Sequence, residues 1–133
     1  MSKDNIDVVQ DVYTKFGQGD VAGILTVVDD DVVWHFVGRP EDYPVFGVRR
    51  GHAGVQAFFK AIAEHEQITE FTPREFYSDA DKVFVLGHAA YRLKRTGKTA
   101  SSDWTHIFTL REGKVTAFQE FLDTAQIAAA HRD

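Results

Sequence analysis

The sequence predicts an α+β fold with a mostly antiparallel sheet, and the order of its elements carries this prediction. Apolar residues recur at helical spacing over residues 4–16 and again over 21–28. One strand-like run, 32–37, and a third helix, 52–66, come next. Strand-like runs separated by turn signals then fill the chain up to a short alanine-rich helix over 124–131. Elements that are segregated in this way, rather than alternating, are typical of α+β domains.

Length and composition limit the possible classes of protein. A chain of 133 residues is the size of one domain, 1–133, and its 44% hydrophobic and 26% charged residues are typical of a globular protein. The net charge of −5, with scattered Lys and Arg, argues against a nucleic-acid partner, because phosphate binding requires a clustered basic face. The chain has no cysteine, which excludes disulfides and thiolate metal sites.

Membrane and secretion signals are also missing from the sequence. No apolar run approaches the roughly 20 residues that a membrane-spanning helix requires. The first residues lack the apolar core of a signal peptide. We therefore expect a soluble, cytoplasmic protein that does not contact a membrane.

Capping and breaking residues define the two N-terminal helices. Asp4 or Ser2 can cap the first helix, and Gly17 can end it. Asp20 can cap the second, which the acidic residues 29–31 should end. These three adjacent carboxylates fit a solvated turn better than a metal site, because no second carboxylate cluster follows at ligand spacing.

The middle of the chain predicts a covered strand and a folded-back loop. The run 32–37 contains Trp34 and is apolar on both faces, so we expect both faces to be covered. The following loop, 38–51, is long and rich in Gly and Pro. Tyr43 and Phe46 within it need burial, so the loop should fold back over the protein.

Two further strands are expected before the last hairpin. Residues 68–77 fit an edge strand, because Pro73 removes a hydrogen-bond donor in the middle of the run. Residues 83–95 fit a long strand. Gly87 and its small neighbours predict curvature there, or the close approach of another element.

The register of the last hairpin decides which side chains meet around its turn signal at residues 111–114. A three-residue loop ending in Gly113 gives glycine the left-handed position that a type I turn plus bulge requires. Trp104 then faces Glu120. A two-residue loop would instead pair Trp104 with Phe121 and send Glu120 to the other face. We favour the three-residue loop.

In this register, one face of the hairpin mixes aromatic and ionisable side chains: Trp104, His106, Phe108, Phe118, Glu120 and Leu122. His106 should face Phe118, diagonally from Glu120. A carboxylate and an imidazole in apolar surroundings can act as general acid or base near neutral pH. Two structural alternatives stay open, namely a core histidine for His106 and a structural carboxylate for Glu120.

Other catalytic motifs are missing. No two histidines have His-x-x-x-His spacing, so we expect no metal. The sequence contains no G-x-S-x-G, P-loop or G-x-G-x-x-G motif, which argues against nucleophilic and nucleotide chemistry and against a nucleotide cofactor.

Several short segments together resemble a known family. They are Trp34, Phe46-Gly47, Arg50-Gly51, Gly54-Val55, Phe58-Phe59, Trp104-Thr105-His106 with Phe108, Gly113-Lys114-Val115, and the run from Phe118 to Ala125. Over essentially the whole chain, this set is similar to the SnoaL-like, ketosteroid-isomerase-related proteins of the nuclear transport factor 2-like superfamily. That fold hosts isomerases, cyclases, hydrolases, dehydratases and binding domains, so function must be argued from the site.

The resemblance implies a curved sheet wrapped around three helices into a cone-shaped α+β barrel with an interior apolar pocket. It also implies homodimers through the sheet, and a pocket carboxylate as acid/base without a metal or organic cofactor. Glu120 and Asp123 fall in the matching last-strand motif. Tyr13 is the tyrosine nearest to the position of the isomerase's tyrosine, although the isomerase's base and oxyanion pair do not align residue by residue.

Three functions follow as hypotheses. The first is an enzyme of isomerase or cyclase type that moves a proton on a small hydrophobic, carbonyl-bearing molecule. Glu120 would be the base, His106 would orient it or donate to an enolate oxygen, and the pocket would be lined by Trp34, Tyr43, Phe58 and Trp104. The second is a binding module for a small hydrophobic ligand. The third is a dimerisation domain, whose pocket should be filled by side chains.

Overall fold

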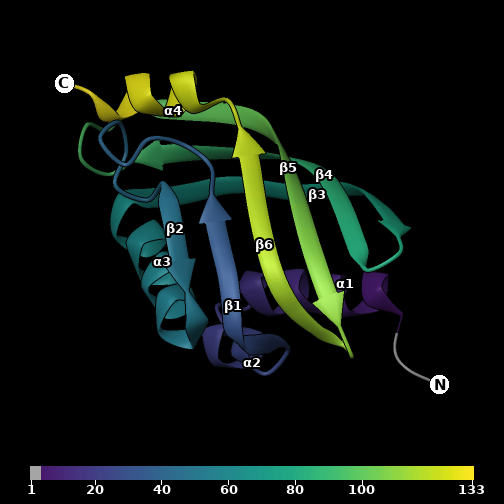
Figure 1. Ribbon diagram of the computed structural model, residues 1–133. Coiled ribbons are helices and arrows are strands. Elements are labelled where there is room, and N and C mark those ends of the chain that lie inside the picture. The colour runs from purple at the N-terminus through teal and green to yellow at the C-terminus, as the bar shows by residue number, and fades with distance from the viewer. Residues whose placement is uncertain (1–3) are drawn as a thin grey trace.

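A six-stranded curved sheet forms one layer of the protein, and helices cover its inner face (Figure 1). The computed structural model describes residues 4–133. The strands are β1 (Val28–Phe36), β2 (Gly47–Arg50), β3 (Glu66–Asp79), β4 (Lys82–Leu93), β5 (Thr99–Arg111) and β6 (Lys114–Leu122), in the spatial order β2-β1-β6-β5-β4-β3. Only the β1–β6 pair is parallel among the described strands. The expected α+β class with a mostly antiparallel curved sheet is therefore confirmed.

The helices are α1 (Asn5–Gly17), α2 (Val21–Leu25), α3 (Gly51–His65) and α4 (Thr124–His131). Asp4 caps α1 by accepting a hydrogen bond from the Ile6 N–H at 2.9 Å, and Ser2, the alternative cap, lies outside the described residues. Asp20 caps α2 in the same way through the Gly23 N–H. Figure 1 shows α1 and α3 on the same face of the sheet, while α4 lies across one end of it. No helix within residues 4–133 has the length and apolarity to cross a membrane.

The second helix is shorter than predicted, because the first strand begins earlier. Val28 pairs with Val115 of β6, so residues 29–31 lie inside β1 and do not form the expected turn. The pairing with β6 outweighs the low strand preference of aspartate. Asp30 and Asp31 are exposed, in a stretch of β1 where the register with β6 is irregular.

The long loop contains a strand that the sequence did not reveal. Residues 47–50 of this loop form β2, which pairs antiparallel with β1, and Gly51 begins α3. A strand this short, with one glycine and two arginines, has no period-two pattern to detect. As predicted, Tyr43 and Phe46 are buried, with 0% and 2% of their surfaces exposed.

The third and fourth strands follow the predictions closely. Strand β3 is at the edge of the sheet, with a register irregularity beside Pro73. On β4, Gly87 lies against the Trp104 ring and the Thr72 carbonyl: a Cβ atom there would overlap the ring and would lie 2.7 Å from the carbonyl oxygen. The close approach expected at this glycine is confirmed.

The turn of the β5–β6 hairpin differs from our preferred prediction. It is a two-residue turn, in which Arg111 pairs with Lys114 and both Glu112 and Gly113 have positive φ, 53° and 78°. Two positive φ values define the type I′ turn, whose twist matches the flanking strands. The preferred three-residue loop was therefore wrong.

A bulge beside the turn then changes the register once more. Leu110 pairs with Val115, but Thr109 pairs with Ala117, so Thr116 is an extra residue in β6. With the two-residue turn alone, Glu120 would point to the outer face. The extra residue shifts the pairing by one position and returns Glu120 to the inner face. His106 therefore faces Glu120 directly, which neither predicted register contained, and Glu120 still shares the inner face.

The two faces of the sheet differ in burial. On β1, Trp34 is 2% exposed on the inner face, whereas Val33 and His35 on the outer face are only partly buried, as is Val37 just after the strand. The expectation that both faces are covered therefore holds for the inner face alone within this chain. The core lies between the inner face and the helices.

Candidate functional site

An interior cavity lies between the inner face of the sheet and helices α1 and α3. The space open to the centres of water-sized molecules is about 60 Å³, within about 640 Å³ of empty space that includes the mouth. Ten aromatic side chains line it: Tyr13, Phe16, Trp34, Phe36, Phe58, Phe59, Phe71, Tyr91, Phe108 and Phe118. The cavity is therefore narrow and largely apolar, which suits a slim or flat molecule.

A chain of three polar side chains crosses the cavity wall. The Tyr13 hydroxyl of α1 lies 2.7 Å from Nδ1 of His106 on β5. On the other side of the ring, Nε2 lies 3.2 Å from Oε2 of Glu120 on β6. This second contact has the length of an ion pair but not the alignment of a hydrogen bond, so Nε2 has no hydrogen-bond partner among the described residues.

Aromatic rings hold this chain in place. The Trp104 ring stacks on His106 with 3.8 Å between ring centroids, and Tyr13 lies nearly parallel to the imidazole. Burial, and then the charge of Glu120, raise the pKa of Tyr13 well above its usual value. The phenol is therefore a neutral hydrogen-bonding group at physiological pH.

The tautomer of His106 follows from its two neighbours. If the Tyr13 hydroxyl donates to Nδ1, the neutral ring carries its proton on Nε2, on the side of the Glu120 carboxylate. In this arrangement each donor faces an acceptor: the Tyr13 hydroxyl faces Nδ1, and the Nε2 proton faces Glu120. The arrangement lets His106 orient Glu120, and it leaves the carboxylate facing the cavity as a base.

Most of the predicted ligand-binding residues line the cavity. Trp34, Phe58, Phe108 and Phe118 do so together with Tyr13, His106 and Glu120. Two others lie one layer further out: Trp104 packs behind His106, and Tyr43 is buried behind Glu66. Both support residues of the wall rather than forming part of it.

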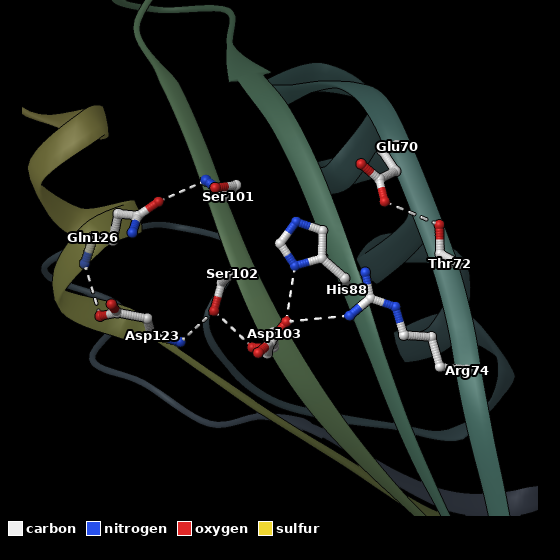
Figure 2. Close-up of polar contacts among 9 residues, drawn as sticks. All are labelled: Glu70, Thr72, Arg74, His88, Ser101, Ser102, Asp103, Asp123 and Gln126. Carbon is white, nitrogen blue, oxygen red and sulfur yellow. Dashed lines mark hydrogen bonds and ion pairs between the residues drawn. The ribbon is translucent and has the colours of Figure 1, made fainter.

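The third predicted catalytic residue, Asp123, is not part of the cavity. Its side chain is exposed and accepts a hydrogen bond from the Gln126 N–H at 3.1 Å, which caps α4. Figure 2 shows this cap and the Ser102 hydroxyl, which accepts from the Asp123 N–H. Strand β6 ends at Leu122, so Asp123 belongs to the connection to α4, outside the inner face.

A second buried carboxylate, which was not among the predicted site residues, also lines the cavity. Glu66, at the junction of α3 and β3, is 8% exposed and lines the cavity. Its Oε2 accepts a hydrogen bond of 2.6 Å from Tyr43. Its position four residues after Ile62 continues the apolar stripe of α3, which is the signal that could have revealed it.

The surroundings of Glu66 keep a proton available near neutral pH. Burial raises the pKa of Glu66, the Tyr43 hydrogen bond opposes this effect, and the charge of Glu120 adds to it, which gives a value of about 7. Burial followed by the charges of Glu66 and Glu120 likewise raises the pKa of Tyr91, another cavity residue. Two carboxyl groups therefore line one cavity, and the charge of Glu120 contributes to the raised pKa of Glu66.

The outer face carries a separate polar cluster. Figure 2 shows Asp103 of β5 between His88 of β4, at 2.9 Å, and Arg74 of β3, at 3.8 Å. Because Asp103 is largely exposed, these ion pairs contribute little to stability. No three His, Asp or Glu side chains within residues 4–133 come close enough together to hold a metal ion.

Comparisons with known proteins place this fold in a family. The sequence matches the SnoaL-like domain over residues 9–118. A crystal structure of an NTF2-like protein from Burkholderia xenovorans LB400 is 33% identical, with a TM-score of 0.89 and 99% of this chain and 98% of that chain covered. No curated protein matches the sequence.

Two further crystal structures extend the similarity. An NTF2-like protein of unknown function from Burkholderia pseudomallei K96243 is 26% identical, with a TM-score of 0.86 and 97% and 98% of the two chains covered. TerC, co-crystallised with polyporic acid, is 29% identical, with a TM-score of 0.81 and 95% and 96% covered. From the family match and the shared architecture, the chain belongs to the SnoaL-like domain family of the nuclear transport factor 2-like superfamily.

Proposed function

We propose that this protein is a cofactor-independent enzyme of isomerase or cyclase type, which moves a proton on a slim, hydrophobic, carbonyl-bearing molecule bound in the cavity. The observation that carries the proposal is the Tyr13–His106–Glu120 chain in an aromatic wall. A carboxylate placed beside an apolar cavity is poorly solvated, which makes it an effective base toward a carbon acid.

The proposed roles follow from the contacts. Glu120 removes a proton from the carbon next to the carbonyl group. His106 holds the carboxylate in position from the side, and Tyr13 holds the imidazole in the tautomer that faces Glu120. The stacked and edge-on rings around them position a flat substrate.

A related protein supports this class of ligand. TerC, which shares 29% of its sequence with this chain, was crystallised with polyporic acid. We infer that the cavity of this protein also takes a small organic molecule. The narrow space favours a ligand that slides between the rings rather than a bulky one.

The proposal is tested with the ketone 2-tetralone in D₂O. We expect the protein to speed deuterium exchange at the carbon beside the carbonyl group, as followed by proton NMR. Glu120→Gln should lower the rate roughly 100-fold or more, the usual contribution of a general base. Asp123→Asn, which keeps the α4 cap on the surface, is the matched control and should retain the rate. Exchange at the buffer rate with bound ketone, or full activity of Glu120→Gln, would contradict the proposal.

A binding module for a small hydrophobic ligand is the second candidate. The apolar lining of this narrow space favours it, since a largely apolar pocket with a few polar groups is typical of small-molecule sites. The same narrowness fits a dimerisation domain with a filled pocket. Native mass spectrometry separates these cases: an unchanged retained ligand supports the binding module, and an empty protein that rejects every ketone supports the dimerisation domain.

We also propose a homodimer that forms through the outer face of the sheet. Leu86 and Phe121 flank Thr105 on that face and are 37% and 41% exposed, and Val48 of β2 is 50% exposed. Apolar side chains gathered on one sheet face commonly mark an interface. Light scattering should give twice the chain mass of 15.0 kDa. Phe121→Lys should give the single-chain mass, whereas Gln10→Lys on the exposed side of α1 should not.

A further inference from the structure

Glu66 is a carboxyl group that faces the cavity and has no part in the Tyr13–His106–Glu120 chain. It begins β3, where the chain leaves α3, and is 8% exposed. The Tyr43 hydroxyl donates to Oε2. The second oxygen, Oε1, makes no hydrogen bond within residues 4–133, which leaves it available to a ligand.

The other hydrogen-bond donors of the cavity wall are directed at a neighbour or do not release a proton. Tyr13 and His106 are hydrogen-bonded to each other, and Nε2 of His106, which has no hydrogen-bond partner among the described residues, lies 3.2 Å from Oε2 of Glu120. The indole N–H of Trp34 has no partner among the described residues, but an indole does not release its proton. The hydroxyl of Tyr91 has a pKa raised by burial, so it can donate a hydrogen bond but does not pass on a proton near neutral pH.

Glu66 differs from the phenol and indole groups because it can exist in both protonation states near neutral pH. The titratable groups around it come from each neighbouring element: Tyr43 of the loop, Tyr91 of β4, Glu120 of β6, and His65 and His131 packed behind Tyr43. None of the described residues that line the cavity is Lys or Arg. Burial therefore dominates, and the pKa of Glu66 rises to about 7.

We propose that Glu66 is the general acid of this cavity, which binds the carbonyl oxygen of the ligand and protonates it while Glu120 removes a proton from the adjacent carbon. The inference rests on the proposed function, because it assigns a second catalytic residue to the same site. Two carboxyl groups with different partners within one cavity, Tyr43 for Glu66 and His106 for Glu120, form the pair that acid and base catalysis requires.

The proton and electron balance of the step is complete. Glu120 takes a proton from carbon, and the electron pair of that C–H bond becomes the C=C bond. The π pair of the carbonyl group moves to oxygen, which takes the proton of Glu66. The products are a neutral enol, protonated Glu120 and ionised Glu66. Return of a proton from Glu120 to the same carbon or to a conjugated one, and of the enol proton to Glu66, resets both groups.

The same arrangement restricts the class of ligand. A neutral ketone or enone can accept from protonated Glu66. A carboxylate-bearing ligand would meet Glu66 and Glu120 without any Lys or Arg among the described cavity residues to balance it. The site should therefore select neutral carbonyl compounds over their carboxylate analogues.

Binding measurements test Glu66 without relying on turnover. At pH 6, 2-tetralone should bind about tenfold more tightly than tetralin, which lacks the oxygen, because one additional buried hydrogen bond forms. At pH 8.5 this preference should disappear in the wild type. Glu66→Gln, whose amide still donates, should keep the preference at both pH values. The double variant Glu66→Leu with Tyr43→Phe, which leaves no unpaired hydroxyl, should lose the preference but bind tetralin normally.

Exchange kinetics then separate the two proposals. The wild-type rate with 2-tetralone should fall above about pH 7, and Glu66→Gln should be at least tenfold slower without this fall. A ketone preference that is independent of pH and survives the double variant would overturn the assignment of Glu66. So would Glu66→Gln with the wild-type rate and pH profile, even if Glu120→Gln is inactive. Conversely, an active Glu120→Gln would remove the proposed base but leave the binding result for Glu66 standing.

Discussion

His106 and Glu120 lie directly opposite each other on β5 and β6, with 3.2 Å between Nε2 and Oε2. They meet because Thr116, between the turn and the site, is not paired with a residue of β5. The residues of β6 that follow it are therefore paired one position further along than the turn alone would set. Side chains alternate between the faces of a strand, so a hairpin of the same length without the bulge would direct Glu120 outward. The bulge therefore determines the composition of the cavity wall.

Deleting Thr116 should preserve this relationship. The chain would then form a regular ladder in which Thr109 still pairs with Ala117 and His106 still faces Glu120. We expect a loss of about 1–2 kcal/mol from the altered twist, measured by urea denaturation, with the site retained in an NMR or crystal structure.

Deleting Gln119 is the matched control, because it is also one residue removed from β6. The deletion turns either Glu120 or Phe118 to the outer face, because β6 has no unpaired residue beyond position 119 that could restore the alternation of faces. This variant should unfold or lose several times more stability. Equal losses for the two deletions would show that the bulge does not set the register.

The pH dependence of stability should report the buried proton of Glu66. Its pKa is 4.5 in the unfolded chain and about 7 in the folded protein. Between these values the folded state holds a proton that the unfolded state releases, so the free energy of unfolding falls as pH rises. Over this window the loss should be on the order of 3 kcal/mol. Denaturant titrations from pH 4 to 8 measure it.

Glu66→Gln provides the reference for this measurement, because glutamine keeps an acceptor for Tyr43 but does not titrate. His131 acts in the opposite direction: burial lowers its pKa, so its contribution improves as pH rises toward 6.5. This term is common to both proteins. The difference in the free energy of unfolding between the wild type and Glu66→Gln should therefore fall as pH rises. Parallel curves of this free energy against pH would mean that Glu66 is ionised in the folded state.

The contact between Gly87 and Trp104 makes a third prediction. Gly87→Ala would place a methyl group against the Trp104 ring and the Thr72 carbonyl. The overlap should cost about 1–3 kcal/mol and displace the ring that stacks on His106, visible in urea denaturation and tryptophan fluorescence. Gly17→Ala at the end of α1 meets no atom within 4 Å and should be neutral or stabilising.

The cap of α4 makes a fourth prediction. Asp123→Ala removes the acceptor for the Gln126 N–H and should cost about 1 kcal/mol in thermal or urea unfolding. Proton exchange with 2-tetralone should not change below the melting transition. A loss of exchange with an intact fold would return Asp123 to the chemistry.

The sequence predicted the order of the elements except β2, and it predicted the inner face of the hairpin from a turn that the protein does not use. Gly113 indicated a three-residue loop, whereas the protein uses a two-residue turn followed by the Thr116 bulge. The two arrangements leave Glu120 on the same face. A bulge of this kind has no sequence signature, because Thr116 is an ordinary strand residue; its position is set by packing on both sides of β6.

The sequence revealed residues of the candidate site only where an ionisable side chain interrupts an apolar or aromatic pattern. His106 and Glu120 interrupt an aromatic strand pair and could be found. Glu66 was missed because it lies at a helix–strand junction, where helical periodicity ends and the strand pattern has not begun. Its pairing with Tyr43 spans 23 positions in the chain and requires the fold to be known.

The position of β6 in the sheet has a consequence for biosynthesis. It lies between β1 and β5, although it follows every other described strand along the chain. Until residues 114–122 leave the ribosome, the sheet consists of two separate pieces, β2-β1 and β5-β4-β3, each with an open edge. The sheet can therefore be completed only after β6 has been synthesised. Nascent or truncated chains that end before β6 should present two unpaired strand edges to chaperones and to each other.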